Sequence, residues 1–205
     1  IASIIMIVTF IMLFVAGGKI KHLFGIIMPA MLTLAIFFIF SSDYRRERML
    51  NFIDPWKDAA DAGYQLIQSF LALGSGGLTG LGIGQSRQKT LYMPEPHNDF
   101  IFSIIGEELG LIGCLVIIGL FLIFIWRGIK IAMTAKDTYG KLLAVGITSI
   151  IAVQAIINIA VVTGSMPVTG VPMPFISYGG TSLVINLTAM GILLNISRQV
   201  ERKTD

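Results

Sequence analysis

The chain has 205 residues, of which 55% are hydrophobic and 13% are charged, with a mean hydropathy of +0.82 and a formal net charge of +3. A soluble domain of this size carries about twice that charged fraction, so the composition excludes a soluble globular protein. The single cysteine, Cys114, excludes a disulfide framework within the chain. We expect membrane lipids, and no nucleic acid, among the partners.

Blocks of apolar residues long enough to cross a bilayer, which takes roughly 20 residues, follow one another along the chain. No charged n-region or small-residue cleavage site accompanies the first block, which argues against a secretory signal peptide. The expected fold is an all-α, polytopic helical bundle that forms a single integral membrane domain over 1–205. Because the sequence opens with Ile1 inside apolar sequence, we expect a fragment of a longer protein. We predict five spans, at about 1–18, 23–40, 100–126, 142–163 and 181–197.

Charges lie unevenly between the predicted spans. The 164–180 connection has no charge, and the long 41–99 connection balances basic with acidic residues. The other connections and the C-terminal tail are basic, so the positive-inside rule predicts that they face the cytoplasm. The 41–99 and 164–180 loops then face outward. The basic residues concerned are Lys19, Lys21, Arg127, Lys130, Lys136, Lys141, Arg198, Arg202 and Lys203.

The outer loop 41–99 begins with a charged stretch, "RRERMLNFIDPW". Its arginines, Arg48 among them, favour either an interfacial anchor that reaches lipid phosphates or a contact to a substrate phosphate. Further along, Tyr64, Ile67 and Leu71 recur at helical spacing, with Gln68 between them. That segment is too short and too polar to span, so we predict an interfacial or re-entrant helix.

A glycine-rich stretch, "GSGGLTGLGIGQSRQK", follows this helix and holds six glycines between Gly74 and Gly84. It matches neither the Walker A spacing nor the dinucleotide-binding pattern. Backbone amides freed by glycine would cradle a phosphate, with Arg87 and Lys89 beside them. A flexible loop is the alternative reading of the same residues.

The outer loop ends in "PEPHNDF", which places Glu95, His97 and Asp99 at the start of the third predicted span. Carboxylates inside a span are costly and are functional candidates. Glu107 would lie about 12 Å deeper than Asp99, too far for the two to act together like the carboxylate pair of a glycosidase. We therefore expect Glu107 and Glu108 to pair with donors on neighbouring helices.

On the fourth predicted span, Gln154 and Asn158 share a helix face, which predicts helix–helix hydrogen bonds. The following stretch, "GSMPVTGVPMPFISYGGTS", has prolines and glycines that forbid a regular helix, yet it is apolar and uncharged. Irregular backbone of this kind is tolerated near a membrane only when it is buried in protein or lines a watery cavity. We expect this loop to fold back into the bundle and to meet "PEPHNDF" around a cavity open to the outer side.

"YMPEPHNDFIFSIIGEELGLIG" and "PVTGVPMPFISYGGTS" closely resemble the two signature regions of the SEDS family (shape, elongation, division and sporulation). "RRERMLNFIDPW" and "GYQLIQSFLALGSGGLTGLGIGQSRQK" match in the same order, so the resemblance covers nearly the whole chain. The five predicted spans fit the C-terminal half of the family's ten or so. "GIGQSRQK" and the proline-rich loop look more like the FtsW division and sporulation branch than the RodA elongation branch.

The resemblance implies a peptidoglycan glycosyltransferase that polymerises lipid II at the outer face of the bacterial cytoplasmic membrane, at a division or sporulation septum. It implies a class B penicillin-binding transpeptidase as partner, along with other division or sporulation proteins. The family's essential aspartate falls on Asp99, although Asn98 stands where the family usually has threonine. From position alone, Asp99 is equally an N-cap of the helix that follows, where the helix dipole favours its ionised form.

With Asp99 as the catalytic general base, we assign the substrate contacts to polar and glycine residues predicted on the outer side. A divalent cation, Mg or Mn, held by Asp99 with Glu95 and His97 is an alternative, and no other cofactor is expected. The assigned substrate-binding residues are Arg48, Gln68, Arg87, Gln88, Lys89, Glu95, His97, Ser177, Tyr178, Gly179 and Gly180.

Two other functions compete with polymerisation. Intramembrane carboxylates suit a lipid II flippase, although a flippase needs a polar route to both faces and the polar residues here gather on one. The third hypothesis is a non-catalytic scaffold that recruits a transpeptidase through its spans.

Overall fold

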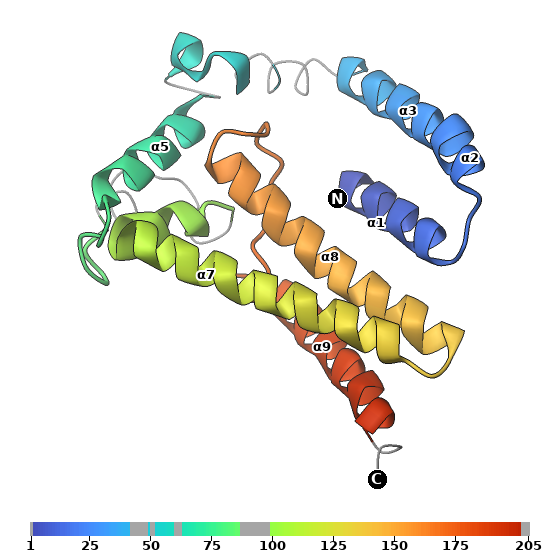
Figure 1. Ribbon diagram of the computed structural model, residues 1–205. Coiled ribbons are helices and arrows are strands. Elements are labelled where there is room, and N and C mark those ends of the chain that lie inside the picture. Colours follow the sequence, from blue (N-terminus) through green and yellow to red (C-terminus); the bar gives the residue numbers. More distant parts are fainter. Residues whose placement is uncertain (1, 42–48, 50–51, 60–62, 87–98, 202–205) are drawn as a thin grey trace. The chain divides into compact units, whose positions relative to one another are not determined.

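The computed structural model describes residues 2–41, 49, 52–59, 63–86 and 99–201 (Figure 1). Within these ranges the chain forms helices and irregular connections and no strand, which confirms the all-α prediction. The chain divides into two compact units. Unit 1 holds Ile1–Phe38, Phe121–Val153 and Gly180–Asp205, and unit 2 holds Ile39–Leu120 and Gln154–Gly179.

Three helices of the described part are long and apolar enough to cross a membrane: α7 (Ile101–Thr134), α8 (Thr138–Val162) and Gly180–Gln199 of α9 (Gly180–Glu201). They overlap the last three predicted spans, and α7 continues past the predicted end near 126 to Thr134. The first two predicted spans hold the shorter helix α1 (Ala2–Val15) and a helical run composed of three elements. That these two segments cross the membrane stays a prediction.

In unit 1, the helical segment that follows α1 changes from α-helical to π-helical geometry and back. It consists of α2 (Ile20–His22), the π-helical turn η1 (Leu23–Ile27) and α3 (Met28–Phe40). Pro29 explains the wide turn, because a proline lacks the amide that a regular helix needs and its ring crowds the carbonyl four residues earlier. The ring of Phe24 in η1 meets the ring of Phe10 edge to face, with centroids 5.5 Å apart, which joins this run to α1.

The second part of α7 and the first part of α8 lie side by side in unit 1 (Figure 1). Gly128 makes the contact close, because a Cβ built there would lie 2.2 Å from Oγ1 of Thr148. Small residues at such crossings let helices approach within van der Waals distance. Asp137 directly precedes α8, and its carboxylate accepts a 2.8 Å hydrogen bond from the amide of Gly140 in the manner of an N-cap.

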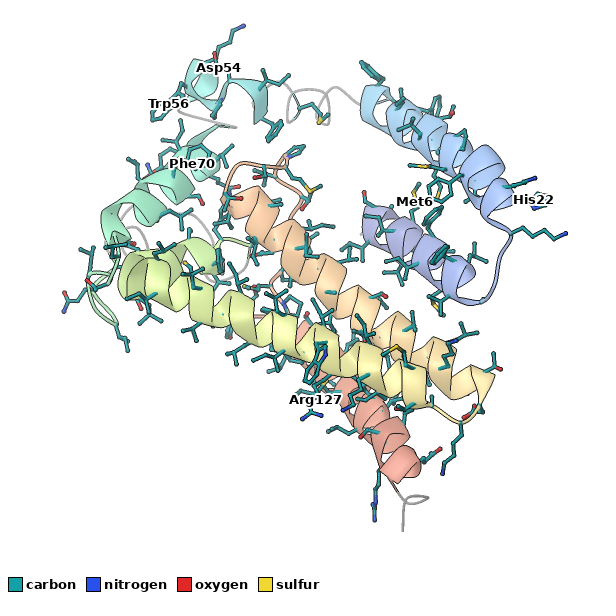
Figure 2. All side chains as sticks on the ribbon, viewed as in Figure 1. Met6, His22, Asp54, Trp56, Phe70 and Arg127 are labelled. Carbon is teal, nitrogen blue, oxygen red and sulfur yellow. The ribbon has the colours of Figure 1, made fainter. Side chains whose placement is uncertain are left out.

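In unit 2, the short 3-10 helix η2 (Pro55–Asp58) precedes α5 (Tyr64–Gly76), which lies where a non-spanning helix was predicted. Ser69 is fully buried and donates a 2.9 Å hydrogen bond to the carbonyl of Val162 at the end of α8. Phe70 of α5 points at the turn after α8, where a Cβ on Gly164 would lie 2.4 Å from its ring (Figure 2). Leu71, which the spacing grouped with buried Ile67, is 48% exposed, because the buried face of α5 runs through Leu66, Ser69 and Ala72 instead.

The helix of the third predicted span, α7, contains a break that the sequence pattern did not predict. The chain of α7 leaves helical geometry at Gly110, whose φ is 67° and ψ is −165°. A residue with a side chain rarely adopts such a positive φ, whereas glycine does so freely. A Cβ at this position would also lie 2.4 Å from the amide nitrogen of Gly80. The break in α7 is therefore a place where another segment of unit 2 approaches.

Candidate functional site

Asp99 lies two residues before the first helical residue of α7, and it is half-buried. The next residue, Phe100, is 2% exposed, and its carbonyl accepts hydrogen bonds from the amide of Ser103 at 3.0 Å and from the hydroxyl of Ser103 at 2.7 Å. The start of α7 is thus fixed by packing and by local bonds. This anchoring gives Asp99 a defined place at the end of the helix.

Asn158 of α8 holds the backbone of Asp99. Its Nδ2 donates a 2.8 Å hydrogen bond to the carbonyl of Asp99 and a second 2.8 Å bond to the carbonyl of Val171. The predicted helix–helix hydrogen bond is not the one that forms, because these partners belong to the turn before α7 and to the loop after α8. Gln154, its neighbour one turn earlier, is half-buried.

The loop after α8 is irregular from Gly164 to Gly179, as its prolines and glycines predicted. It nevertheless packs into unit 2, since Val171 and Met173 are 4% and 1% exposed. Gly170 lies against the aspartate: a Cβ built on it would be 3.4 Å from Oδ2 of Asp99. The expectation that the proline-rich loop meets the "PEPHNDF" end of the outer loop is therefore confirmed at Asp99.

Ser177, an assigned substrate contact, shapes this same loop. Its hydroxyl accepts a 2.7 Å hydrogen bond from the amide of Met173, and its own amide donates a 3.1 Å bond to the carbonyl of Met173. Tyr178 is 83% exposed, Gly179 is half-buried, and Gly180 is the exposed first residue of α9. Gln68 lies half-buried on α5. Their contacts to a substrate stay predictions.

The glycine-rich loop inserts into the break of α7. In an uninterrupted helix, the amides of Leu111 and Ile112 would donate to the carbonyls of Glu107 and Glu108. Here those amides donate instead to the carbonyls of Gly77 and Leu78, at 2.9 and 3.2 Å. The two carbonyls of α7 accept from the amides of Leu81 and Gly82, at 2.9 and 3.0 Å. In this loop the described amides of Leu81 and Gly82 are bonded to α7, so the predicted phosphate cradle is not formed by them.

Glu107 lies beside this insertion and is 1% exposed. Its Oε2 accepts a short hydrogen bond from the hydroxyl of Ser86, at the end of the described part of the glycine-rich loop. This donor belongs to a loop, and pairing of Glu107 with donors on neighbouring helices stays a prediction. Oε1 of Glu108 is buried without a hydrogen-bond partner among the described residues. A structural role for both carboxylates stays a prediction.

Six of the assigned site residues lie outside the described residues, and their predicted roles stay predictions. The members of this set are Arg48, Arg87, Gln88, Lys89, Glu95 and His97. Among the residues that are described, no group of three or more His, Cys, Asp or Glu side chains is placed to hold a metal ion. Two members of the trio suggested for Mg or Mn, Glu95 and His97, belong to the set outside the described residues.

Sequence reasoning missed three contributors around Asp99 and Glu107: the contact of Gly170, the double bond of Asn158 to two loop carbonyls, and the hydroxyl of Ser86. Gly170 was noted only as a helix breaker, and its position beside the carboxylate depends on tertiary folding. The i, i+4 pairing of Gln154 and Asn158 did indicate a buried polar face. It carried no information on which backbone groups that face would bind.

The long apolar helices define the class: a multi-pass helical membrane protein. The model of the family that contains FtsW, RodA and SpoVE, described as "Cell cycle protein", matches residues 1–202. The chain belongs to this family.

Curated relatives agree with that membership. The chain is 51% identical over 190 residues to "Stage V sporulation protein E" of Bacillus subtilis, covering 92% of this chain and 51% of the relative. It is 45% identical over 194 residues to "Probable peptidoglycan glycosyltransferase FtsW" of Geobacter metallireducens, covering 95% of this chain and 52% of the relative. The chain therefore spans about half the length of the curated relatives it matches.

Two solved structures share the fold. One, titled "Structural coordination of polymerization and crosslinking by a peptidoglycan synthase complex", superposes with a TM-score of 0.75 at 28% identity, over 97% of this chain and 55% of that chain. The other is a mutant of the rod shape determining protein RodA of Thermus thermophilus. It superposes with a TM-score of 0.50 at 30% identity, over 64% of this chain and 40% of that chain.

Proposed function

We propose that this chain contributes the catalytic carboxylate of a peptidoglycan glycosyltransferase, with Asp99 as the general base. The observation that carries the proposal is the position of the Asp99 carboxylate, where the start of α7 meets the proline-rich loop at Gly170. Relatives at 45% identity and above carry the name of a peptidoglycan glycosyltransferase or of a sporulation protein of the same family.

The proposed reaction joins the acceptor sugar to the donor. The 4-hydroxyl oxygen of the acceptor attacks the anomeric carbon of the lipid II donor, and a C–O bond forms as the bond to the undecaprenyl pyrophosphate breaks. Asp99 takes the hydroxyl proton, and the electron pair leaves with the pyrophosphate. That leaving group needs cationic stabilisation more than a proton, and Arg48, Arg87 and Lys89 are the proposed contacts.

A single-carboxylate mechanism fits the surroundings of the second acidic residue. Glu107 is 1% exposed and its carboxylate is engaged by the hydroxyl of Ser86. A carboxylate enclosed in this way is unsuited to protonating or attacking a substrate sugar. This favours assigning to Asp99 alone the proton transfer that glycosidases divide between two carboxylates.

We place the site on the outer face of the bacterial cytoplasmic membrane, with the C-terminus in the cytoplasm, because the basic connections indicate that orientation. The two polyprenyl tails then lie in lipid beside the spans. The partner we propose is a class B transpeptidase that crosslinks the glycan product. Its support is the fold shared with a chain of a peptidoglycan synthase complex in which polymerization and crosslinking are coordinated.

The test follows the polymerisation of fluorescent lipid II by the purified full-length protein with its transpeptidase partner. Asp99→Ala and Asp99→Asn are expected to lower the rate roughly 100- to 10,000-fold, the usual contribution of a general base. Asp54→Asn is the matched control, because Asp54 is exposed beside η2 and should keep full activity. Glycan chains of near-normal length and amount from both Asp99 variants would overturn the base assignment.

The same preparation separates the competing functions. Polymerisation by the wild-type protein excludes a purely scaffolding role. Movement of labelled lipid II across proteoliposomes, with no glycan product, would instead support the flippase hypothesis.

A further inference from the structure

The side chain of Asn158 connects three segments of unit 2 that are distant in sequence. It extends from α8 and is 1% exposed, and its two donor bonds reach backward 59 residues to Asp99 and forward 13 residues to Val171. Both neighbours are carbonyl oxygens, which only accept. The NH₂ group must therefore face them, and this fixes the orientation of the amide.

These two bonds act on both sides of the proposed base. One fixes the backbone of Asp99 itself, and the other fixes Val171, which directly follows the glycine that lies against the Asp99 carboxylate. Gly170 has a φ of 66°, so an alanine there would be strained, and its Cβ would lie in van der Waals contact with Oδ2 of Asp99. One amide thus bonds the backbone on both sides of the contact between the Asp99 carboxylate and Gly170.

Packing alone does not account for an asparagine at this position. Its Oδ1 is buried without a hydrogen-bond partner among the described residues. A buried polar atom left unpaired is unfavourable, and a leucine of similar shape would fill the space without it. The feature that leucine cannot supply is the NH₂ group and its pair of hydrogen bonds.

We propose that Asn158 is a positioning residue for Asp99: by holding the carbonyls of Asp99 and Val171 together, it fixes the carboxylate against the proline-rich loop in the geometry that the acceptor hydroxyl requires. This rests on the proposed function, and Asn158 itself does not touch the substrate. A misplacement of about 1 Å costs roughly 100-fold in rate when the reacting groups must be aligned.

The first measurement is steady-state polymerisation by the full-length Asn158→Leu protein. We expect kcat to fall roughly 100-fold while KM for lipid II stays within about threefold, because alignment is lost and substrate contacts are not. Asn186→Leu is the matched control: Asn186 is an asparagine of α9 with 5% exposure, bonded to Ser182 of its own helix, and kcat should be unchanged.

The second measurement does not depend on activity. Val171→Cys, in a Cys114→Ala background, places a thiol at a position that is 4% exposed in the loop. We expect labelling by a water-soluble maleimide to be slow with Asn158 present and at least about tenfold faster with Asn158→Leu, since local opening controls access to buried groups. Asp99→Asn removes the proposed base, so polymerisation should fall roughly 100- to 10,000-fold. It keeps the backbone carbonyl that Asn158 binds, so labelling should stay slow.

The kcat and the labelling rate of the Asn158→Leu protein together decide whether Asn158 positions Asp99. A lower kcat together with faster labelling supports the proposal. An unchanged kcat overturns it whatever the labelling shows, and a lower kcat with unchanged labelling overturns it too, because Asn158 would then act without holding the loop. If Asp99→Asn remains active, the base assignment fails separately, and the labelling result still shows whether Asn158 holds the loop.

Discussion

Two stretches of unit 2 depart from helical geometry within apolar sequence: the break of α7 at Gly110 and the proline-rich loop after α8. Their backbone amides and carbonyls find hydrogen-bond partners in different ways. At the break, the carbonyls and amides freed in α7 pair with the backbone of the glycine-rich loop. In the proline-rich loop, side chains contribute as well: Asn158 donates to the carbonyl of Val171, and Ser177 accepts from the amide of Met173.

This difference predicts which kind of substitution should destabilise each region. A backbone-to-backbone contact requires that side chains be absent, so the break in α7 should be sensitive to an added methyl group. A side-chain-to-backbone contact requires a particular donor or acceptor, so the proline-rich loop should be sensitive to atoms removed. Both kinds of pairing meet the same demand, since buried backbone groups left unpaired are costly.

The largest effect is expected from Gly80→Ala, measured as the free energy of unfolding of the full-length protein in detergent micelles. A Cβ at Gly80 would lie 2.1 Å from the carbonyl oxygen of Glu108, at a φ of +79°. We expect a loss of about 4 kcal/mol, combining overpacking with backbone strain.

Gly84→Ala is its matched control, because Gly84 has the same φ of +79° and nothing within 4 Å of the added Cβ. It should cost only the strain, about 1 kcal/mol. Equal losses at the two positions would mean that insertion of the loop into α7 contributes nothing to stability.

A second pair should give effects of opposite sign on the same unfolding measurement. Gly76→Ala, at the end of α5, would bring a Cβ within 1.9 Å of the carbonyl oxygen of Gly106, so we expect a loss of about 3 kcal/mol. Gly74→Ala lies in the same helix with nothing within 4 Å, and helix propensity predicts a gain of up to about 1 kcal/mol. Two stabilised variants would contradict the close approach of α5 to α7.

The smallest effect on the free energy of unfolding is expected in the proline-rich loop. Ser177→Ala removes the acceptor for the amide of Met173, which should lower the free energy of unfolding by about 1 kcal/mol. Thr169→Ala, in an exposed position of the same loop, should change it by less than about 0.5 kcal/mol. If the two variants are equally stable, the hydroxyl of Ser177 does not help to hold the loop.

Much of this architecture could be predicted from local sequence. Apolar blocks predicted the long helices, and three prolines predicted the irregular segment after α8. The break of α7 could not be predicted, because α7 holds several glycines, including Gly106 and Gly113, and only Gly110 adopts a positive φ. What distinguishes Gly110 is the arrival of Gly80 and Leu78 from another segment, which no local pattern encodes.

For the candidate site, too, part could be predicted from the sequence and part depends on the tertiary fold. The resemblance of "PEPHNDF" to a family signature selected Asp99, and the proline-rich loop was correctly expected beside it. Helical spacing identified Asn158 as one of a polar pair, yet its partners follow from the tertiary fold. The roles of Arg87, Lys89 and the other residues outside the described ranges stay predictions.

The filled break in α7 also bears on transport. Discontinuous helices in membrane transporters leave their half-helix ends open, and the exposed amides and carbonyls there coordinate the moving ion or substrate. In α7 the amides of Leu111 and Ile112 and the carbonyls of Glu107 and Glu108 are already bonded to the chain's own loop. The break in α7 therefore differs from the open half-helix ends of a transporter: both amides already donate, and each carbonyl already accepts one hydrogen bond.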